Sequence, residues 1–309
     1  AALPRAELIL AVPDLPNAPL ATKVAKMAAG TAHLGTRADV VCFVDDDIAL
    51  PPDALTVLVA PLYDASPAGA TFGLACQTSW DTPWESLMSG FVNANALTGY
   101  VPLIFFTPPY TVTGHVFALR RTVFEQSGGM DGLEKRFDDD HEIARRVRAL
   151  GLPLAQTPLV YGVANELKSL AAYHRQMRRW FVMPRQGMAS SLTTREKTVS
   201  TLLSLGNLLP SLLLLCAVFA PSRVTLSGVV LASAAFLGCY LYLETRYLPA
   251  RTPYRGLLML PLVAFLTPLH VLIALLLPGN RITWRGQTYE AQRGGALEAT
   301  DDPRKHFIE

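Results

Sequence analysis

The chain has 309 residues, of which 50% are hydrophobic and 17% charged, and its formal net charge is +2. This composition is too apolar for an ordinary soluble enzyme, which carries about 25% charged residues. The small net charge gives no reason to expect a nucleic-acid partner. Apolar residues are concentrated in residues 199–279, whereas residues 1–198 have the mixed composition of a globular domain.

Within residues 1–198, short apolar runs alternate with segments of helical spacing. Residues 39–44 are a continuous apolar run with the length of a buried parallel strand. Further strands are expected at residues 7–11, 70–76 and 111–120, and helices at residues 20–34, 51–62, 83–98 and 139–150. The alternation predicts an α/β fold with a mainly parallel sheet.

Three apolar segments follow, at about residues 199–219, 225–245 and 257–277. Each is close to the ~20 residues that cross a lipid bilayer. One soluble domain would not bury three such segments in a row. We therefore predict that α-helical transmembrane segments follow the globular domain.

The loops between these segments differ in charge. Residues 246–255 contain three arginines, whereas residues 220–224 contain one. Positive residues favour the cytoplasmic side of a membrane, so the first loop and the globular domain are expected to face the cytoplasm. The four cysteines show no disulfide pattern, which agrees with this location.

Asp45, Asp46 and Asp47 directly follow the apolar run 39–44. Ligands of an open α/β sheet bind at the carboxyl ends of its strands. Carboxylates at such a position can hold Mg²⁺ or Mn²⁺, which would neutralise the diphosphate of a donor. The strand-like alternate spacing of Asp45 and Asp47 lets both point the same way while Asp46 points elsewhere. A solvated acidic turn before the next helix accounts for the three acids equally well.

A second acidic group, Asp138 to Asp140, lies at the start of the expected helix 139–150. The dipole at a helix N-terminus favours ionised carboxylates. Transfer of a sugar with inversion needs one carboxylate as a general base, which removes the proton of the acceptor hydroxyl. Simple helix capping is the alternative interpretation.

A third group is the segment Gln176-Met177-Arg178-Arg179-Trp180. Its cations suit contacts with donor phosphates. Its tryptophan suits packing against an acceptor sugar or a lipid headgroup. A basic helix that binds anionic lipid is the alternative. Gln-x-x-Arg-Trp is more specific than a basic run, and the order of the three groups before apolar segments is not expected by chance.

In this order the motifs resemble the inverting, GT-A-fold glycosyltransferases of families 2 and 21, most closely the ceramide glucosyltransferases. The similarity extends from about residue 16 to residue 298. The catalytic residues that the resemblance implies are Asp140 as general base, with Gln176, Arg179 and Trp180. The donor-binding residues that it implies are Asp45, Asp46, Asp47 and Asp139, with Asp45 and Asp47 as ligands of a divalent cation.

The resemblance also implies an organisation and an activity. Residues 1–198 would form a GT-A-like catalytic domain, residues 199–279 a membrane region with about three apolar helices, and residues 280–309 a tail of the cytoplasmic type. The protein would be an integral membrane enzyme with its catalytic domain facing the cytoplasm. It would move a hexose, glucose in the family, from a UDP-sugar to a lipid such as ceramide, with inversion.

The chain departs from the family near its N-terminus. The family's first aspartate has no convincing counterpart, since Asp14 lies among prolines. The family's membrane anchor and first two strands also have no counterpart, so we expect the chain to be incomplete at its N-terminus. A further conflict concerns the tail, in which residues 282–286 resemble the family. Three membrane crossings would place this tail on the opposite side from the catalytic domain.

Two other functions fit part of the pattern. Processive polysaccharide synthases share the motif series, but they usually have more membrane helices than this chain. A membrane protein that has lost donor binding and binds only a lipid or a partner is the other alternative.

Overall fold

The structure is a computed structural model that describes residues 22–34, 38–276, 279–284 and 287–299. Its α-helices are α1 (Thr22–Leu34), α2 (Ala54–Val59), α3 (Pro83–Asn95), α4 (Val101–Phe106), α5 (Arg121–Gln126), α6 (Asp139–Ala149), α7 (Leu170–Gln186), α8 (Thr194–Phe219), α9 (Arg223–Tyr247) and α10 (Tyr254–Leu276). Its strands are β1 (Val40–Val44), β2 (Ile48–Ala49), β3 (Ala70–Gln77), β4 (Val116–Arg120), β5 (Leu154–Val163), β6 (Arg281–Trp284), β7 (Gln287–Ala291) and β8 (Leu297–Ala299). Three short helical turns are η1 (Ala60–Leu62), η2 (Ala96–Tyr100) and η3 (Met188–Ser190). The strand expected at residues 7–11 lies outside the described residues, as does Asp14.

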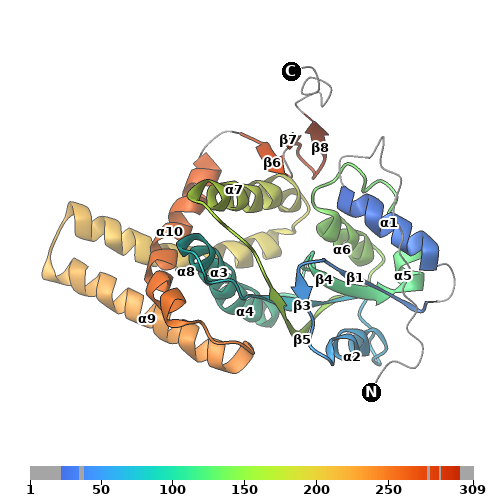
Figure 1. The fold of residues 1–309 in the computed structure, drawn as a ribbon, viewed down its shortest axis with the longest axis horizontal. Helices are drawn as coiled ribbons and strands as arrows, with labels where there is room; N and C mark the ends of the chain where they lie inside the picture. The colour runs from blue at the N-terminus through green and yellow to red at the C-terminus, as the bar shows by residue number, and fades with distance from the viewer. Residues whose placement is uncertain (1–21, 35–37, 277–278, 285–286, 300–309) are drawn as a thin grey trace.

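The central sheet has the strand order β1-β4-β3-β5-β2 (Figure 1). β3 and β5 pair in parallel, whereas β4 pairs antiparallel with both β1 and β3, and β2 pairs antiparallel with β5. The α/β class is as predicted. β1, β3 and β5 run in the same direction, whereas β4 and β2 run opposite to their neighbours, so the sheet is mixed because β4 inserts between β1 and β3. Apolar periodicity reports that a strand is buried but not which strand it pairs with or in which direction.

Strand β5 had no counterpart among the predicted strands. It contains Pro158, which disfavours a strand assignment. The structure accommodates this proline at an irregularity, because the register with β3 shifts between Phe72 and Leu74. Thr157 Oγ1 donates a hydrogen bond of 3.0 Å to the Phe72 carbonyl there. The strand therefore continues past the proline to the edge where the candidate site lies.

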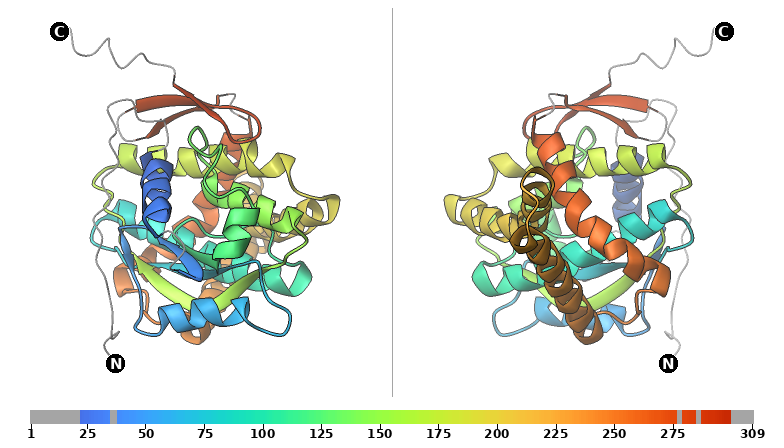
Figure 2. Two further views of the ribbon diagram at one scale, coloured as in Figure 1. Left: turned by 90° about the vertical axis from the view of Figure 1, so that its right-hand side faces the viewer. Right: turned by 90° about the vertical axis from the view of Figure 1, so that its left-hand side faces the viewer.

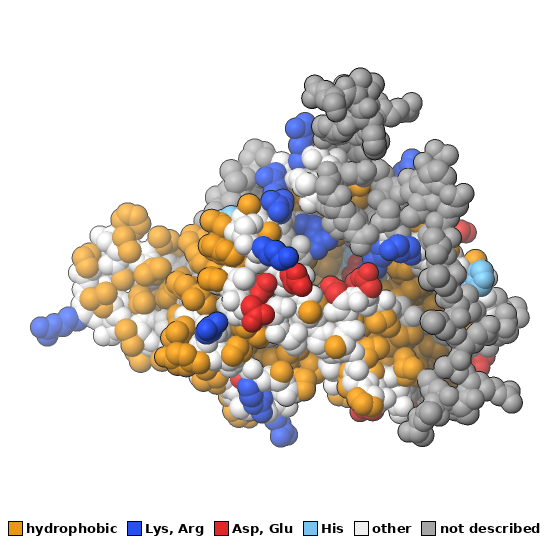
Figure 3. All heavy atoms as spheres, in the orientation of Figure 1, with side chains coloured by type: hydrophobic (Ala, Val, Ile, Leu, Met, Phe, Trp, Pro, Cys, Tyr) orange, Lys and Arg blue, Asp and Glu red, His pale blue; other side chains and the backbone are white. Residues whose placement is uncertain are grey.

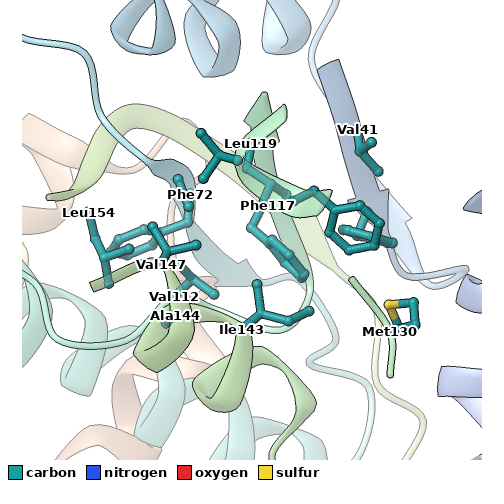
Figure 4. Close-up of a cluster of buried hydrophobic side chains, with 14 of the residues drawn as sticks. Val41, Phe72, Val112, Phe117, Leu119, Met130, Ile143, Ala144, Val147 and Leu154 are labelled. Atoms are coloured by element: carbon teal, nitrogen blue, oxygen red, sulfur yellow. The ribbon is translucent and has the colours of Figure 1, made fainter. Parts of the chain in front are cut away.

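Helix α6 packs one face of the sheet and is held there by its apolar stripe. Ile143, Ala144 and Val147 are buried against Phe72 and Phe117 of the sheet (Figure 4). The predicted helix 139–150 is therefore confirmed, and its buried stripe fixes the direction in which its acidic first turn points. Burial of each large apolar side chain contributes on the order of 2 kcal/mol.

Helix α3 begins where a proline and a capping box predict a helix start. The Thr82 hydroxyl accepts a hydrogen bond from the backbone N–H of Glu85, and the Glu85 carboxylate accepts one from the backbone N–H of Thr82. Glu85 also accepts a hydrogen bond of 3.1 Å from the Leu167 backbone N–H. The start of α3 is thereby tied to the segment that follows β5 and leads into α7.

The three apolar segments are helices α8, α9 and α10, as predicted. In the described part of the chain, α9 is the one helix that is long and apolar enough to cross a membrane, and only 6% of its most apolar stretch is buried. Helices α8 and α9 project from the globular body as a pair, and α10 runs across them (Figures 1 and 2). Hydrophobic side chains cover the projecting lobe (Figure 3). Among the described helices, length and composition thus suit membrane crossing for α9.

Strands β6, β7 and β8 form a separate antiparallel sheet with the order β6-β7-β8. This tail sheet packs on the globular domain, because Ile282, Tyr289 and Leu297 are buried against Phe137 and Val182. The side chain of Trp284 and the residues Arg285 and Gly286, which carry part of the family resemblance, lie outside what the structure describes. The tail therefore belongs to the same compact body as α6 and α7 (Figure 2).

Candidate active site

The strand order brings three distant segments to one edge of the sheet. β1 ends at Val44, directly before Asp45, and its antiparallel neighbour β4 begins at Val116, directly after His115. The backbone N–H of Asp45 donates a hydrogen bond of 2.9 Å to the His115 carbonyl. The first turn of α6 faces the same edge, since Asp140 lies against Gly114. The first two predicted acidic groups therefore meet, about 95 residues apart in the sequence.

Lys23, on α1, lies among these acids. Its ammonium is 2.8 Å from Asp45 Oδ1 and donates a hydrogen bond of 2.8 Å to the Gly114 carbonyl. Burial alone would lower the pKa of Lys23. The carboxylates of Asp139, Asp45 and Asp140 outweigh that effect and raise it. The ammonium thus stays charged and partly neutralises the acidic cluster.

No sequence pattern singles out Lys23, because a single lysine near the start of an amphipathic helix is usually a solvated surface residue. No sequence pattern marks Gly114 as part of the site either. A Cβ atom at residue 114 would lie 2.7 Å from Asp140 Oδ2, so a side chain there would collide with that carboxylate. Lys23 and Gly114 belong to the candidate site only because the fold brings α1, the start of β4 and α6 together.

Asp140 is half-buried and accepts a hydrogen bond of 2.8 Å from the backbone N–H of His141. Burial is the main cause that raises the pKa of Asp140 to about 7, and the neighbouring Asp139 carboxylate raises it further. Lys23 acts in the opposite direction. A carboxylate with a pKa near neutrality is a stronger base than a solvated one and still ionises at physiological pH.

Asp139 is 8% exposed, and its Oδ2 atom has no hydrogen-bond partner within the described part of the protein. Burial raises the pKa of Asp139, and the Asp45 carboxylate raises it further, while Lys23 lowers it. An unpartnered carboxylate oxygen in such a place is costly unless a ligand or a cation completes it. The Asp139 carboxylate thus has one oxygen that is open to a ligand or a cation.

The segment from Gln176 to Trp180 lies on α7. The Arg179 guanidinium donates a hydrogen bond of 3.0 Å to Gln176 Oε1, so the two motif residues orient each other. Trp180 packs against Phe91 of α3, with ring centroids 6.2 Å apart. In this structure the indole therefore contributes to the packing of α7 on α3.

His115 connects α7 with the acidic cluster. Burial lowers the pKa of the His115 imidazole, the carboxylates of Asp45 and Asp47 raise it, and Lys23 and Arg179 lower it. Arg179 is thus within electrostatic range of the same imidazole as Asp45 and Lys23. Residues of the first and third predicted groups therefore lie within electrostatic range of one buried imidazole.

Asp46 and Asp47 lie in a turn after Asp45 and are exposed, whereas Asp45 is half-buried. The strand ends at Val44, so strand-like alternation does not align Asp45 with Asp47. Within the described residues, no three His, Cys, Asp or Glu side chains converge as a metal site. Magnesium, however, is commonly bound by one or two carboxylates plus substrate phosphates. Asp45 and Asp47 carry the carboxylates that such a site would use.

The tail packs against the residues that precede α6 and against the end of α7. The Phe137 backbone N–H donates to the Gly295 carbonyl at 3.2 Å, and the Gly294 N–H donates to the Gln186 carbonyl at 2.7 Å. Asp138 is buried beneath this turn and is paired with Arg136 through hydrogen bonds of 3.0 and 3.1 Å. The tail therefore holds α7 and the start of α6 in fixed positions relative to each other.

We expect Gly295→Ala to destabilise the protein more than Gly294→Ala. Both glycines have positive φ, 93° and 92°, so alanine costs about 1–2 kcal/mol at either position. A Cβ atom at residue 295 would collide with the Asp138 carboxylate, whereas one at residue 294 meets no atom within 4 Å. The collision should add about 1–3 kcal/mol. Thermal unfolding in detergent measures the difference, and equal melting temperatures would contradict the proposed contact.

The comparison with protein-family models matches residues 4–297 to the family described as glycosyl transferase family 21. The comparison with curated proteins found no match.

Proposed function

Because the chain belongs to glycosyl transferase family 21, and is therefore a glycosyltransferase, we propose that it moves one hexose from a UDP-sugar to the hydroxyl group of a membrane lipid, with inversion. Glucose as the sugar and ceramide as the acceptor are the first choices, on the resemblance to the ceramide glucosyltransferases. The observation that supports this function most is the gathering of Asp45, Asp139 and Asp140 around Lys23, with Arg179 within electrostatic range of the adjacent His115.

Asp140 is the proposed general base. Its carboxylate takes the proton of the acceptor hydroxyl, and the oxygen forms a bond to the anomeric carbon of the donor. The bond between that carbon and the diphosphate oxygen breaks, and UDP leaves with the electron pair. The attack comes from the face opposite the leaving group, which inverts the anomeric centre. The partial burial that raises the pKa of Asp140 makes it suited to this role.

The positive charge around the donor diphosphate has two proposed sources. A divalent cation, Mg²⁺ or Mn²⁺, would be held by Asp45 and Asp47 and would neutralise the diphosphate. Lys23 lies 2.8 Å from Asp45 and brings a permanent cation to the same place. Asp46 and Asp139 remain proposed donor-binding residues. Arg179, oriented by Gln176, is placed to stabilise the charge that develops on the leaving UDP.

A lipid acceptor is supported by the apolar helices beside the catalytic domain. Helix α9 is long and apolar enough to enter a bilayer, and α10 packs directly on α3. Trp180, on the α7 surface that faces α3, is the proposed contact for the acceptor or its headgroup. The apolar helices thus lie directly beside the catalytic domain, which suits an acceptor that is held in a membrane.

The direct test is a transfer assay. Membranes that contain the protein are incubated with radiolabelled UDP-glucose, ceramide and Mn²⁺, and the lipids are separated by chromatography. A product with one hexose per lipid is expected. A polymer would favour the processive synthase. Binding of ceramide without UDP binding, measured by calorimetry, would favour the degenerate lipid-binding protein.

Transfer should rise as the pH increases through about 7, because only the deprotonated Asp140 carboxylate can accept the hydroxyl proton. The profile of kcat/KM reports this ionisation in the free enzyme. Lys23→Met removes a positive charge that lowers the pKa of Asp140, so it should move the rise to higher pH. Lys26→Met, at an exposed position of the same helix, is the matched control. An unshifted profile in Lys23→Met would contradict the coupling.

A further inference from the structure

The tail and the catalytic domain are joined by hydrogen bonds to backbone carbonyls. Leu297 N–H donates to the Lys135 carbonyl at 2.7 Å, and Arg178 Nε donates to the Arg281 carbonyl at 3.0 Å. Arg185 bonds the Gly279 carbonyl at 3.1 Å, directly after α10. Such contacts require the end of α10 to lie on the same side of any membrane as the catalytic domain.

The start of α10 is tied to the catalytic domain as well. The buried Glu244 carboxylate accepts a hydrogen bond of 2.8 Å from the Thr252 backbone N–H, between α9 and α10. Tyr240, the neighbour of Thr252, belongs to the same buried cluster as Leu74 of β3 and Leu97 of η2. Both ends of α10 therefore adjoin the globular body.

Helix α10 lies along that body between its two ends. Leu260, Val263 and Ala264 are buried, and Gly90 of α3 lets the helix approach closely, because a Cβ atom there would be 3.1 Å from Val263. Ser211, in the middle of α8, donates a hydrogen bond of 2.8 Å to the Phe265 carbonyl. α10 thus crosses the base of the α8–α9 pair rather than extending it (Figure 1).

The α8–α9 hairpin differs from α10 in its exposure. Large apolar side chains near its turn are exposed, including Phe219 at 83% and Val224 at 82%. Helix α9 has 25 residues, hence a length of about 37 Å, which exceeds the ~30 Å hydrocarbon core of a bilayer. Tyr240 and Glu244, near its C-terminal end, are buried, and the remaining exposed apolar surface needs a lipid environment to be stable. The occupant that fits this surface is the hydrocarbon of a bilayer.

We propose that α8 and α9 enter the bilayer as one hairpin and return the chain to the catalytic side, while α10 lies at the base of this hairpin without crossing. The three apolar helices are therefore not equivalent, and the tail shares a side with the catalytic domain. This arrangement resolves the conflict that three crossings would create. It rests on the proposed attachment of the enzyme to a membrane.

The test uses single cysteines in sealed membrane vesicles and a maleimide that cannot pass the membrane. The background carries Cys216→Ala and Cys239→Ala, and its own labelling is subtracted. The probe positions are exposed: Glu134→Cys in the catalytic domain, Arg255→Cys at the start of α10, Arg293→Cys in the tail and Val230→Cys in α9.

We expect the cysteines at residues 134, 255 and 293 to behave alike, reacting all before or all only after permeabilisation. The cysteine at residue 230 should stay unreactive in both states and react once the protein is dissolved in SDS. Opposite behaviour of residues 255 and 293 would show that α10 crosses, and rapid labelling of residue 230 would show that the hairpin is outside the lipid. Either result overturns the arrangement, whereas the transfer assay judges the enzymatic function separately.

Discussion

Asp140→Asn is expected to lower the rate of hexose transfer by about 10³-fold or more, since general-base catalysis contributes about 10²–10⁴-fold and asparagine cannot accept the proton. The substitution keeps the size of the side chain and its hydrogen bond from the His141 backbone. Removing a partly buried charge beside Asp139 should leave the fold intact or slightly stabilise it. The loss should therefore fall on kcat, with donor affinity largely retained.

The measurement is single-turnover transfer with radiolabelled donor, accompanied by thermal unfolding of the purified variant. Asp131→Asn, at an exposed position of the same domain, is the control and should transfer at the wild-type rate. Transfer by Asp140→Asn within about tenfold of the wild type would remove Asp140 from the role of base. If Asp140→Asn does not fold, the same transfer assay is made with Asp140→Glu, which retains a carboxylate.

Asp45→Asn is expected to reduce kcat/KM for the nucleotide sugar by about 100-fold, as for other single groups that stabilise transition-state charge. Asp45 forms an ion pair with Lys23 at 2.8 Å, and its charge raises the pKa of Asp139. It therefore interacts with the lysine and with the acidic first turn of α6, and it is a proposed ligand of the cation. Its loss weakens the hold on the cation and leaves the Lys23 ammonium without its closest carboxylate. The effect should appear as a higher requirement for Mn²⁺ and for donor.

Titration of transfer against Mn²⁺ and UDP-sugar separates this effect from a loss of chemistry. Asp53→Asn, an exposed acid in the same acidic loop region, is the control and should leave both titrations unchanged. A Mn²⁺ requirement in Asp45→Asn equal to that of the wild type would place the cation elsewhere. The double variant Lys23→Met, Asp45→Asn should lose less than the two single losses combined, because the residues act as a pair.

The helix start at Asp139 and the strand end at Val44 were predictable because each rests on local physics. An apolar run of five or six residues predicts a buried strand, and acids before an amphipathic stripe predict a helix N-terminus. The boundaries of β1 and α6 agree with the predicted 39–44 and 139–150 within one residue at each end. The family resemblance then joined these local elements into one expected activity.

The partners of those acids were not predictable. Lys23 meets Asp45 only because α1 lies over the edge between β1 and β4. Asp138 is covered by Gly295 only because the tail returns to α6 after α10. Neither contact has a local signature, since Lys23 and Asp45 lie 22 positions apart on different elements, and Asp138 and Gly295 lie 157 positions apart.

By itself, then, the sequence determined where buried strands and amphipathic helices occur, which residues carry ionisable chemistry and that three helices are apolar. These properties depend on neighbours along the chain. The tertiary structure alone decided that β4 enters the sheet antiparallel, that Lys23 neutralises the acidic cluster and that α10 lies against α3. Those outcomes depend on which apolar faces bury each other best, and that competition involves the whole chain at once.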